Sequence, residues 1–283
     1  MLNGAHGNPM RDLLAPGQQS VSVTNDSGYI DSGASDGGFT LGDVSYSRGF
    51  DGGITARIAA GGLYTDQDIS TGGSFDIKGF YVAPEASIAL GESNVHATLG
   101  GFFSSGRMTV DRGYLNGGAM DYSNGKTDTE TFAAKLRFDW LDAFKYQGTG
   151  FTPYASLSYA HSTIDAYTET GGGFPASFNA ATDHSTMARL GVDMVHGVTD
   201  SFRLLGKAEV SYRFEKQASG TSGEILGLSG FSFAGQDVDQ ISVRGGAGAE
   251  FDVAGGTASL MLNAASQGSD PDVWLRSSWT VRF

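Results

Sequence analysis

Cysteine is absent from the 283 residues, which excludes disulfides, thiolate metal sites and cysteine nucleophiles. The chain also lacks any apolar run approaching the ~18 residues of a membrane-spanning helix. Positive charge is scarce, with 18 Lys and Arg against 31 Asp and Glu. The resulting net charge of −13 argues against nucleic acid as a partner. The residues after Met1 are polar and form no secretory signal, so we expect Met1 to be a processed or truncated start.

Glycine and aromatic residues are abundant instead. The chain has 43 Gly, 18 Phe, 11 Tyr and 3 Trp, an aromatic content that argues for a folded protein rather than a disordered acidic chain. A closed β-barrel is the other structure that satisfies its backbone in lipid, and its signature is a weak alternation of apolar and polar residues.

That alternation runs through most of the chain. In its clearest segment the apolar positions are Phe202, Leu204, Gly206, Ala208, Val210, Tyr212 and Phe214, and the polar ones include Arg203, Lys207, Glu209, Ser211 and Arg213. A period of two puts these sets on opposite faces of a strand. Twelve such segments are predicted, at 19–31, 39–50, 53–66, 74–90, 93–111, 128–142, 150–168, 183–196, 201–214, 237–253, 256–266 and 274–283.

The connections between these segments differ in length in a regular way. The even-numbered connections are mostly tight, such as 51–52 and 91–92, whereas the odd-numbered ones include the long loops 112–127, 169–182 and 215–236. Short periplasmic turns and long extracellular loops are typical of outer-membrane barrels. The sequence therefore predicts an all-β fold: a twelve-stranded antiparallel transmembrane β-barrel over residues 19–283, preceded by a linker at 1–18.

The register also predicts which side chains face the lumen. The inward charges are Arg57, Glu85, Lys135, Arg137, Arg189, Asp193, Arg203, Lys207, Glu209, Arg244, Glu250 and Asp252. A lumen with charges of both signs suits water or a polar segment better than a dry hydrophobic ligand. A twelve-stranded bore should admit about one helix, which is ~10–12 Å wide with its side chains.

The N-terminal segment is a candidate for that helix. Asn8 is a good N-cap, and the helical residues would be Pro9, Met10, Arg11, Asp12, Leu13 and Leu14, ended by 15–17. We expect this tail to enter the lumen without sealing it, with Arg11 or Asp12 meeting wall charges such as Glu209 or Arg244. A frayed tail outside the barrel is the alternative.

No motif predicts chemistry. In His161-Ser162 and His184-Ser185 the two side chains would point to opposite faces of a strand, so neither pair can act as a hydrolase dyad. The five histidines show no metal-ligand spacing, and no motif indicates a cofactor. We therefore expect no enzymatic activity, no metal and no cofactor.

Several short motifs resemble one known family. They are His6–Arg11, Arg112–Gly117, Asp139–Asp142, Thr152–Leu157, Thr168–Pro175 and the terminal Trp279-Thr280-Val281-Arg282-Phe283. In this order and over this length, the chain resembles the C-terminal translocator domain of an autotransporter, the type V secretion system.

The resemblance implies an anchor in the outer membrane of a Gram-negative bacterium that exports its own upstream passenger. Outer-membrane lipids, periplasmic chaperones and the barrel-assembly machinery are the further partners, with Trp279, Val281 and Phe283 as the assembly signal, and a monomer is expected. Self-cleavage is not, because the chain contains no Asn-Asn pair. A small-solute channel is the alternative function, and an outer-membrane hydrolase is a third.

Overall fold

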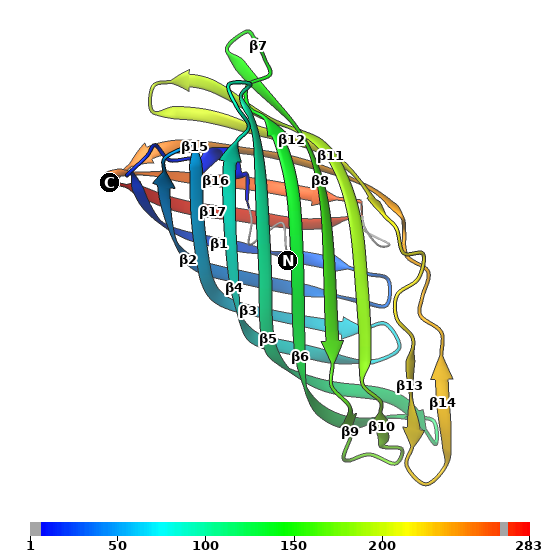
Figure 1. Cartoon of the computed structure of the whole chain (residues 1–283). Helices are drawn as coiled ribbons and strands as arrows, with labels where there is room; N and C mark the ends of the chain where they lie inside the picture. Colours follow the sequence, from blue (N-terminus) through cyan, green and yellow to red (C-terminus); the bar gives the residue numbers. More distant parts are fainter. Residues whose placement is uncertain (1–6, 267–270) are drawn as a thin grey trace.

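The computed structural model describes residues 7–266 and 271–283, and these form a closed antiparallel β-barrel (Figure 1). The last strand pairs with the first over ten residues, from Ser20 with Arg282 to Tyr29 with Val273, and no long strand is left with an open edge. The predicted all-β, twelve-stranded barrel is confirmed. Its strands are β1 (Gln19–Asp31), β2 (Ser35–Phe50), β3 (Ile54–Ile69), β4 (Gly73–Ala89), β5 (Val95–Asn116), β6 (Ala119–Trp140), β8 (Thr149–Ile164), β11 (Ala181–Thr199), β12 (Phe202–Arg213), β15 (Ile241–Val253), β16 (Gly256–Ala265) and β17 (Asp272–Arg282).

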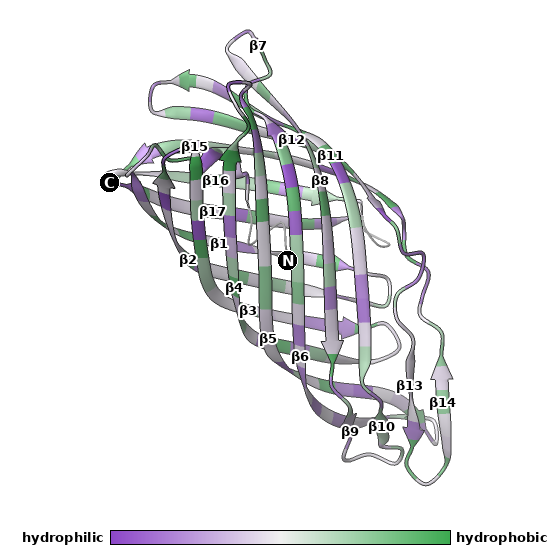
Figure 2. Ribbon diagram, viewed as in Figure 1, coloured by the Kyte–Doolittle hydropathy of each residue, from purple (hydrophilic) through white to green (hydrophobic). Residues whose placement is uncertain are grey.

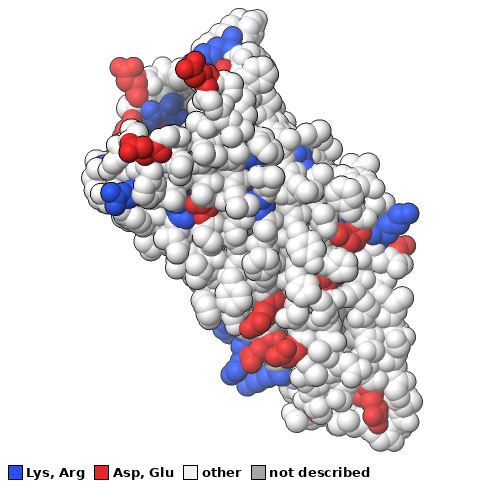
Figure 3. Space-filling model, in the orientation of Figure 1, with Lys and Arg blue, Asp and Glu red and all other residues white. Residues whose placement is uncertain are grey.

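Side chains alternate between the outside and the lumen along these strands. On β6, Leu136 is 42% exposed whereas its neighbour Arg137 is 5% exposed. Figure 2 shows hydrophobic and hydrophilic residues following each other along the long strands. Most of the surface in Figure 3 is uncharged, and acidic and basic side chains lie together near both ends of the molecule. Among the described residues, no helix has the length and apolar character needed to span a membrane.

The two ends of the barrel differ. At one end, which we call the terminal end, β1 begins, β17 finishes and the turns are short; the small strand β7 (Phe144–Tyr146) also lies there. The opposite end, the loop end, carries a four-stranded sheet that projects from the barrel (Figure 1). Its strands are β9 (Tyr167–Thr168), β10 (Ala176–Phe178), β13 (Thr221–Ile225) and β14 (Ser229–Phe233).

The prediction of a long loop at 112–127 is wrong. Strands β5 and β6 continue through it as a hairpin, with Asn116 paired to Ala119. Gly117 and Gly118 form the two-residue turn, and both have positive φ, 61° and 91°. Such turns match the twist of the strands they join and favour glycine, so a run of polar residues is compatible with a strand that has left the membrane.

A buried ion pair fixes this hairpin to the sheet at the loop end. Glu169, 1% exposed, accepts hydrogen bonds from Arg112 Nε at 3.0 and 3.1 Å, from Arg112 Nη2 at 2.7 Å and from the backbone N–H of Ala176. The hydrogen bonds from Arg112 to Glu169 raise the pKa of the Arg112 guanidinium, while burial, with Glu169 nearby, raises the pKa of Tyr167 to about 12. The loop end is thus a structured cap.

Apolar residues pack inside the barrel, on the wall formed by β2 to β6. The cluster consists of Leu41, Ala59, Leu63, Tyr81, Ala83, Phe102 and Ala133, with Phe39, Ile77 and Ala160 against it. The Tyr81 and Phe102 rings stack with centroids 5.4 Å apart. The expectation of a lumen lined by mixed charge therefore holds for only part of the wall; a barrel this narrow packs its inward side chains against one another where no charge is present.

The predicted helix at Pro9–Leu14 is also wrong in length. Only Pro9–Arg11 forms a helix, a single 3-10 turn capped by Asn8, whose side chain accepts from Met10 N. Asp12 ends it, and the backbone N–H of Leu14 donates to Thr55 Oγ1 at 3.1 Å instead of continuing a helix. A helix this short gains little from its own hydrogen bonds, so bonds to the wall decide its shape.

The alternation predicts the effect of charge on the lipid face. Leu136→Arg places a guanidinium outward in the membrane band, which should cost about 2–4 kcal/mol and impair barrel assembly. Leu205→Arg is the control, because Leu205 lines a cavity in the lumen. Heat-modifiable migration on a gel measures assembly in both variants. Equal impairment of the two would contradict the outward placement of Leu136.

Candidate functional site

The lumen consists of two cavities separated by a constriction. The cavity at the terminal end has a volume of about 670 Å³ and the one at the loop end about 410 Å³. Between them lies a space of only about 70 Å³, lined by side chains such as Lys135, Arg137 and Asp193. We call these the terminal cavity, the loop cavity and the waist.

The described N-terminal residues lie inside the terminal cavity. The chain leaves β1 at Gln19, reverses direction through 15–18 and runs inward, so that Gly7 and Asn8 line both the terminal cavity and the waist. The reversal is bonded to β2: Gly17 N donates to Gly49 O at 3.0 Å, and Gly49 N donates to Gln18 O at 2.9 Å. A Cβ on Gly49 would lie 2.1 Å from Ala15 O, so only glycine admits the tail there.

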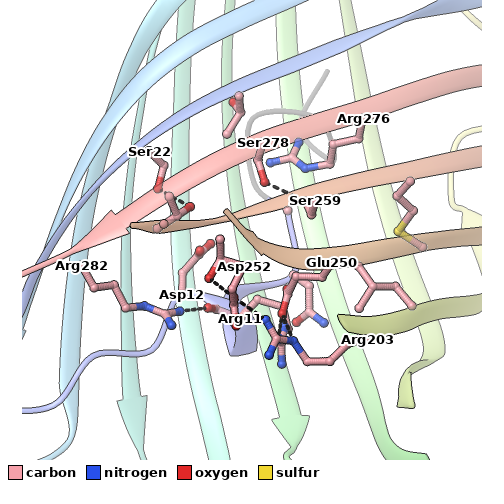
Figure 4. A pocket seen from close by; sticks show the side chains of 18 of the residues that line it. Arg11, Asp12, Ser22, Arg203, Glu250, Asp252, Ser259, Arg276, Ser278 and Arg282 are labelled. Carbon is pink, nitrogen blue, oxygen red and sulfur yellow. Dashed lines mark hydrogen bonds and ion pairs between the residues drawn. The ribbon is translucent and has the colours of Figure 1, made fainter. Parts of the chain in front are cut away.

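Ion pairs and hydrogen bonds hold the tail to the wall (Figure 4). Arg11 forms an ion pair with Glu250, and its Nε donates to Glu250 Oε2 at 3.0 Å. Glu250 also binds Arg203 Nε at 2.6 Å, and Arg282 donates to the backbone carbonyl of Arg11 at 2.6 Å. Met10 and Leu14 are buried, each 7% exposed. Among the predicted inward charges, Arg11 is therefore bound to Glu250, whereas Glu209 and Arg244, the examples suggested from the sequence, lie further into the lumen.

Carboxylates and cations alternate across the waist. Asp193 receives Arg137 Nη2 at 2.7 Å and Lys207 Nζ at 2.6 Å, so one carboxylate bridges two cations from different strands. Arg137 also binds Asp139 through Nε, at 2.8 and 2.9 Å. Such charge-assisted bonds fix side chains that would otherwise be mobile in a wet lumen.

An aromatic ring completes the waist. Tyr154 donates its hydroxyl to Glu209 Oε2 at 2.6 Å, and the Arg137 guanidinium carbon lies 3.7 Å from the ring centroid. Lys207 Nζ lies over the same ring at 4.6 Å. Gly191 makes room for it, because a Cβ there would come within 2.5 Å of Tyr154 Cζ. The ring thus packs against both Arg137 and Lys207 and holds these two cations of the waist in place.

The structure distributes the predicted inward charges over three regions. Arg203, Glu250 and Asp252 surround the tail; Lys135, Arg137, Asp193, Lys207 and Glu209 line the waist; and Arg189, Glu209 and Arg244 border the loop cavity. Arg57 pairs in register with Glu85 and lies 3.6 Å from Asp43. Sequence reasoning missed Tyr154, Asp26, Asp43 and Arg276, although the alternation of inward and outward side chains along their strands places all four inward.

Nothing in the part of the chain that the structure describes forms a metal site: no cluster of three or more His, Asp or Glu is suitably placed. His161 and His184 are paired in register on β8 and β11, while Ser162 and Ser185 line the loop cavity. Each histidine therefore lies on the opposite face of its strand from the serine that follows it, as expected.

A closed barrel with an apolar outside, a charged waist and its own N-terminal segment inside defines a membrane-embedded translocator barrel. The autotransporter β-domain model matches residues 17–265, and the chain belongs to that family. The chain is therefore an outer-membrane protein of Gram-negative bacteria that anchors there and exports a linked passenger.

Solved structures share the fold. The translocator domain of the autotransporter NalP from Neisseria meningitidis has a TM-score of 0.77 at 14% identity, covering 97% of this chain and 92% of that one. The β-domain of the Bordetella autotransporter BrkA has a TM-score of 0.65 at 16% identity, covering 94% and 100%. The Pseudomonas putida toluene transporter TodX gives 0.56 at 9% identity, covering 99% and 92%. A search of curated proteins found no match.

The bridging role of Asp193 predicts a change in ion selectivity. Asp193→Asn leaves Lys207 without its carboxylate and makes the waist more positive, so the pore should shift toward anions. Reversal potentials across a KCl gradient in planar bilayers measure this. Asp142→Asn is the control, since Asp142 binds Lys145 at 3.0 Å in a terminal-end turn. A shift toward cations, or the same shift in the control, would overturn this role.

Proposed function

We propose that residues 1–18 are the end of a linker that stays in the lumen once the passenger has crossed, and that residues 19–283 are the barrel around it. The position of residues 7–14 inside the terminal cavity carries the proposal. Because this segment points from β1 toward the waist, polypeptide further upstream is directed to the loop end, where an exported passenger leaves.

The lumen charges have a holding role in this proposal. Glu250 binds Arg11 from the tail and Arg203 from the wall. One carboxylate therefore joins the tail to the barrel wall. The waist residues then keep the remaining opening narrow. The small-solute channel is less well supported, because the family model that matches residues 17–265 is the autotransporter β-domain.

The domain has no chemical step of its own in this proposal. Family membership supports a secretion role, and the placement of each serine away from the preceding histidine argues against a hydrolase. No described residue group suggests a cofactor. Because no nucleotide is available at the outer membrane, folding of the passenger outside the cell supplies the driving force for export. The barrel acts as a monomer.

The last strand has a further role in assembly. Trp279, Val281 and Phe283 share a parity, and Phe283 exchanges backbone hydrogen bonds with Gln19 at 2.8 and 2.9 Å, at the seam between β17 and β1. The Phe283 side chain is exposed. These positions suit a signal that periplasmic chaperones and the barrel-assembly machinery bind before the seam closes. After closure, outer-membrane lipids cover the apolar face.

Single-channel recordings test the linker. The whole chain should show a small, flickering conductance, and deletion of residues 1–14 should enlarge it several-fold because Gly7, Asn8 and Arg11 are then removed from the waist as well as from the terminal cavity. Arg11→Ala and Glu250→Gln should each raise the open probability, and the double variant should show a coupling of about 1.5–3 kcal/mol, as for a hydrogen bond to a charged group.

Arg48→Ala is the matched control for that series, since Arg48 faces outward over the Phe50 ring. It should leave conductance and open probability unchanged. If deletion of residues 1–14 leaves the conductance as it was, the tail is not the plug, and the channel function becomes the better account.

Reconstitution tests the assembly signal. Phe283→Ser should slow insertion into liposomes that contain the barrel-assembly machinery and leave spontaneous folding into detergent unaffected, because the side chain makes few contacts within the barrel. Phe50→Ser, another exposed phenylalanine at the terminal end, is the control. Slowing in both media, or in both variants, would mean that the substitution destabilises the barrel and that no signal is involved.

A further inference from the structure

The loop cavity lies beyond the segment assigned to the linker. It has a volume of about 410 Å³, within the range of ligand pockets, and none of the described tail residues lines it. Its floor is the waist. The cavity thus has the size of a binding site but no role in the contacts that hold the tail.

One wall of this cavity is apolar. Phe39, Leu41, Leu63 and Phe102 line it from β2, β3 and β5, and Ala133 and Ala160 extend it across β6 and β8. Inward positions of an outer-membrane barrel are ordinarily polar. Binding of an apolar group to this inward apolar surface is favourable by about 25 cal/mol for each Å² that is removed from water.

Two guanidinium groups lie at the floor, on the side away from that wall. Arg244 donates to Asn263 Oδ1 at 2.8 Å and lies over the Trp274 ring at 4.5 Å, but its Nε is out of contact with solvent and has no acceptor among the described residues. Arg189 donates to Ser158 Oγ at 2.8 Å, and its Nη2 has only the Met187 sulfur at 3.1 Å. Both cations therefore have donors without a strong acceptor.

The carboxylates around the cavity are already engaged. Glu209 accepts from Tyr154 and lies 3.7 Å from Arg189 Nε. Across the cavity, Asp26 binds Arg276 through Oδ2 at 2.5 Å while its Oδ1 is buried without a hydrogen bond from the described residues, and Asp272 accepts from the backbone N–H of Asp31. Arg189 and Arg244 thus line the floor without a hydrogen bond to a carboxylate of the described residues, which calls for a negatively charged group there.

We propose that the loop cavity binds a single-chain amphiphilic anion, with its carboxylate on Arg189 and Arg244 and its alkyl chain on the wall of Phe39, Leu41, Leu63 and Phe102. A medium-chain fatty acid has this chemistry, whereas a two-chain lipid exceeds the volume. The ligand enters from the loop end, because the waist is too narrow to admit it from the other side.

Quenching of Trp274 by 11-bromoundecanoate tests this directly. Trp274 lines the cavity, and Trp140 and Trp279, both exposed on the outside, are replaced by Phe so that only Trp274 reports. In lipid nanodiscs the whole chain should show saturable quenching. Arg244→Gln and the uncharged probe 11-bromoundecanol should each weaken apparent affinity about tenfold, as expected for loss of one charge-assisted hydrogen bond.

Arg107→Gln is the control, because Arg107 is exposed on the outside and binds Asp128 at 3.1 Å. It should leave binding unchanged. Quenching that does not saturate, or that is equal for the acid and the alcohol, would overturn the proposal by showing partition from the lipid. Saturable binding that appears only after deletion of residues 1–14 would also overturn it, since the chain itself would then be the occupant.

Discussion

Pairing of β1 with β17 is the constraint on which the rest of the structure depends. A strand in lipid has no water to satisfy its N–H and C=O groups, so each barrel strand needs a partner on both sides. The ten paired residues between β1 and β17, extended by the bonds between Gln19 and Phe283, remove the last open edge. Because the seam joins the two ends of the chain, the barrel closes only after the final strand is in place.

Closure also determines the chemistry of the lumen. Because one of the two alternating sets of side chains faces lipid, charge within the membrane band is confined to the inward set, where cations and carboxylates are close enough to neutralise each other. Asp193 between Arg137 and Lys207, and Glu250 between Arg11 and Arg203, show the same arrangement at different heights. Where charge is missing, around Phe102 and Leu41, the inward side chains form an apolar cluster instead.

The sequence predicted the number of barrel strands and their parity because both follow from a period of two that lipid enforces on every strand. It could not predict the hairpin at Gly117 and Gly118, since a strand outside the membrane needs no apolar face, although Asn116-Gly117-Gly118 is itself a turn signal. The partner of Arg11 was also beyond reach. Glu209 and Glu250 both face the lumen, and only the depth at which Arg11 lies in the barrel decides which of them it binds.

The reversal at residues 15–18 gives the chain a lasso topology. Residues 7–14 lie inside a ring that is closed by the first and last strands of the same polypeptide, and hydrogen bonds rather than a covalent bond close that ring. Tension applied to the tail from the loop end first loads the bonds of Arg11 to Glu250 and of Leu14 to Thr55, and passes to the bonds around Gly49 and to β1 only when those break. The strength of the anchor is therefore set by this short series of bonds at the terminal end rather than by the barrel as a whole.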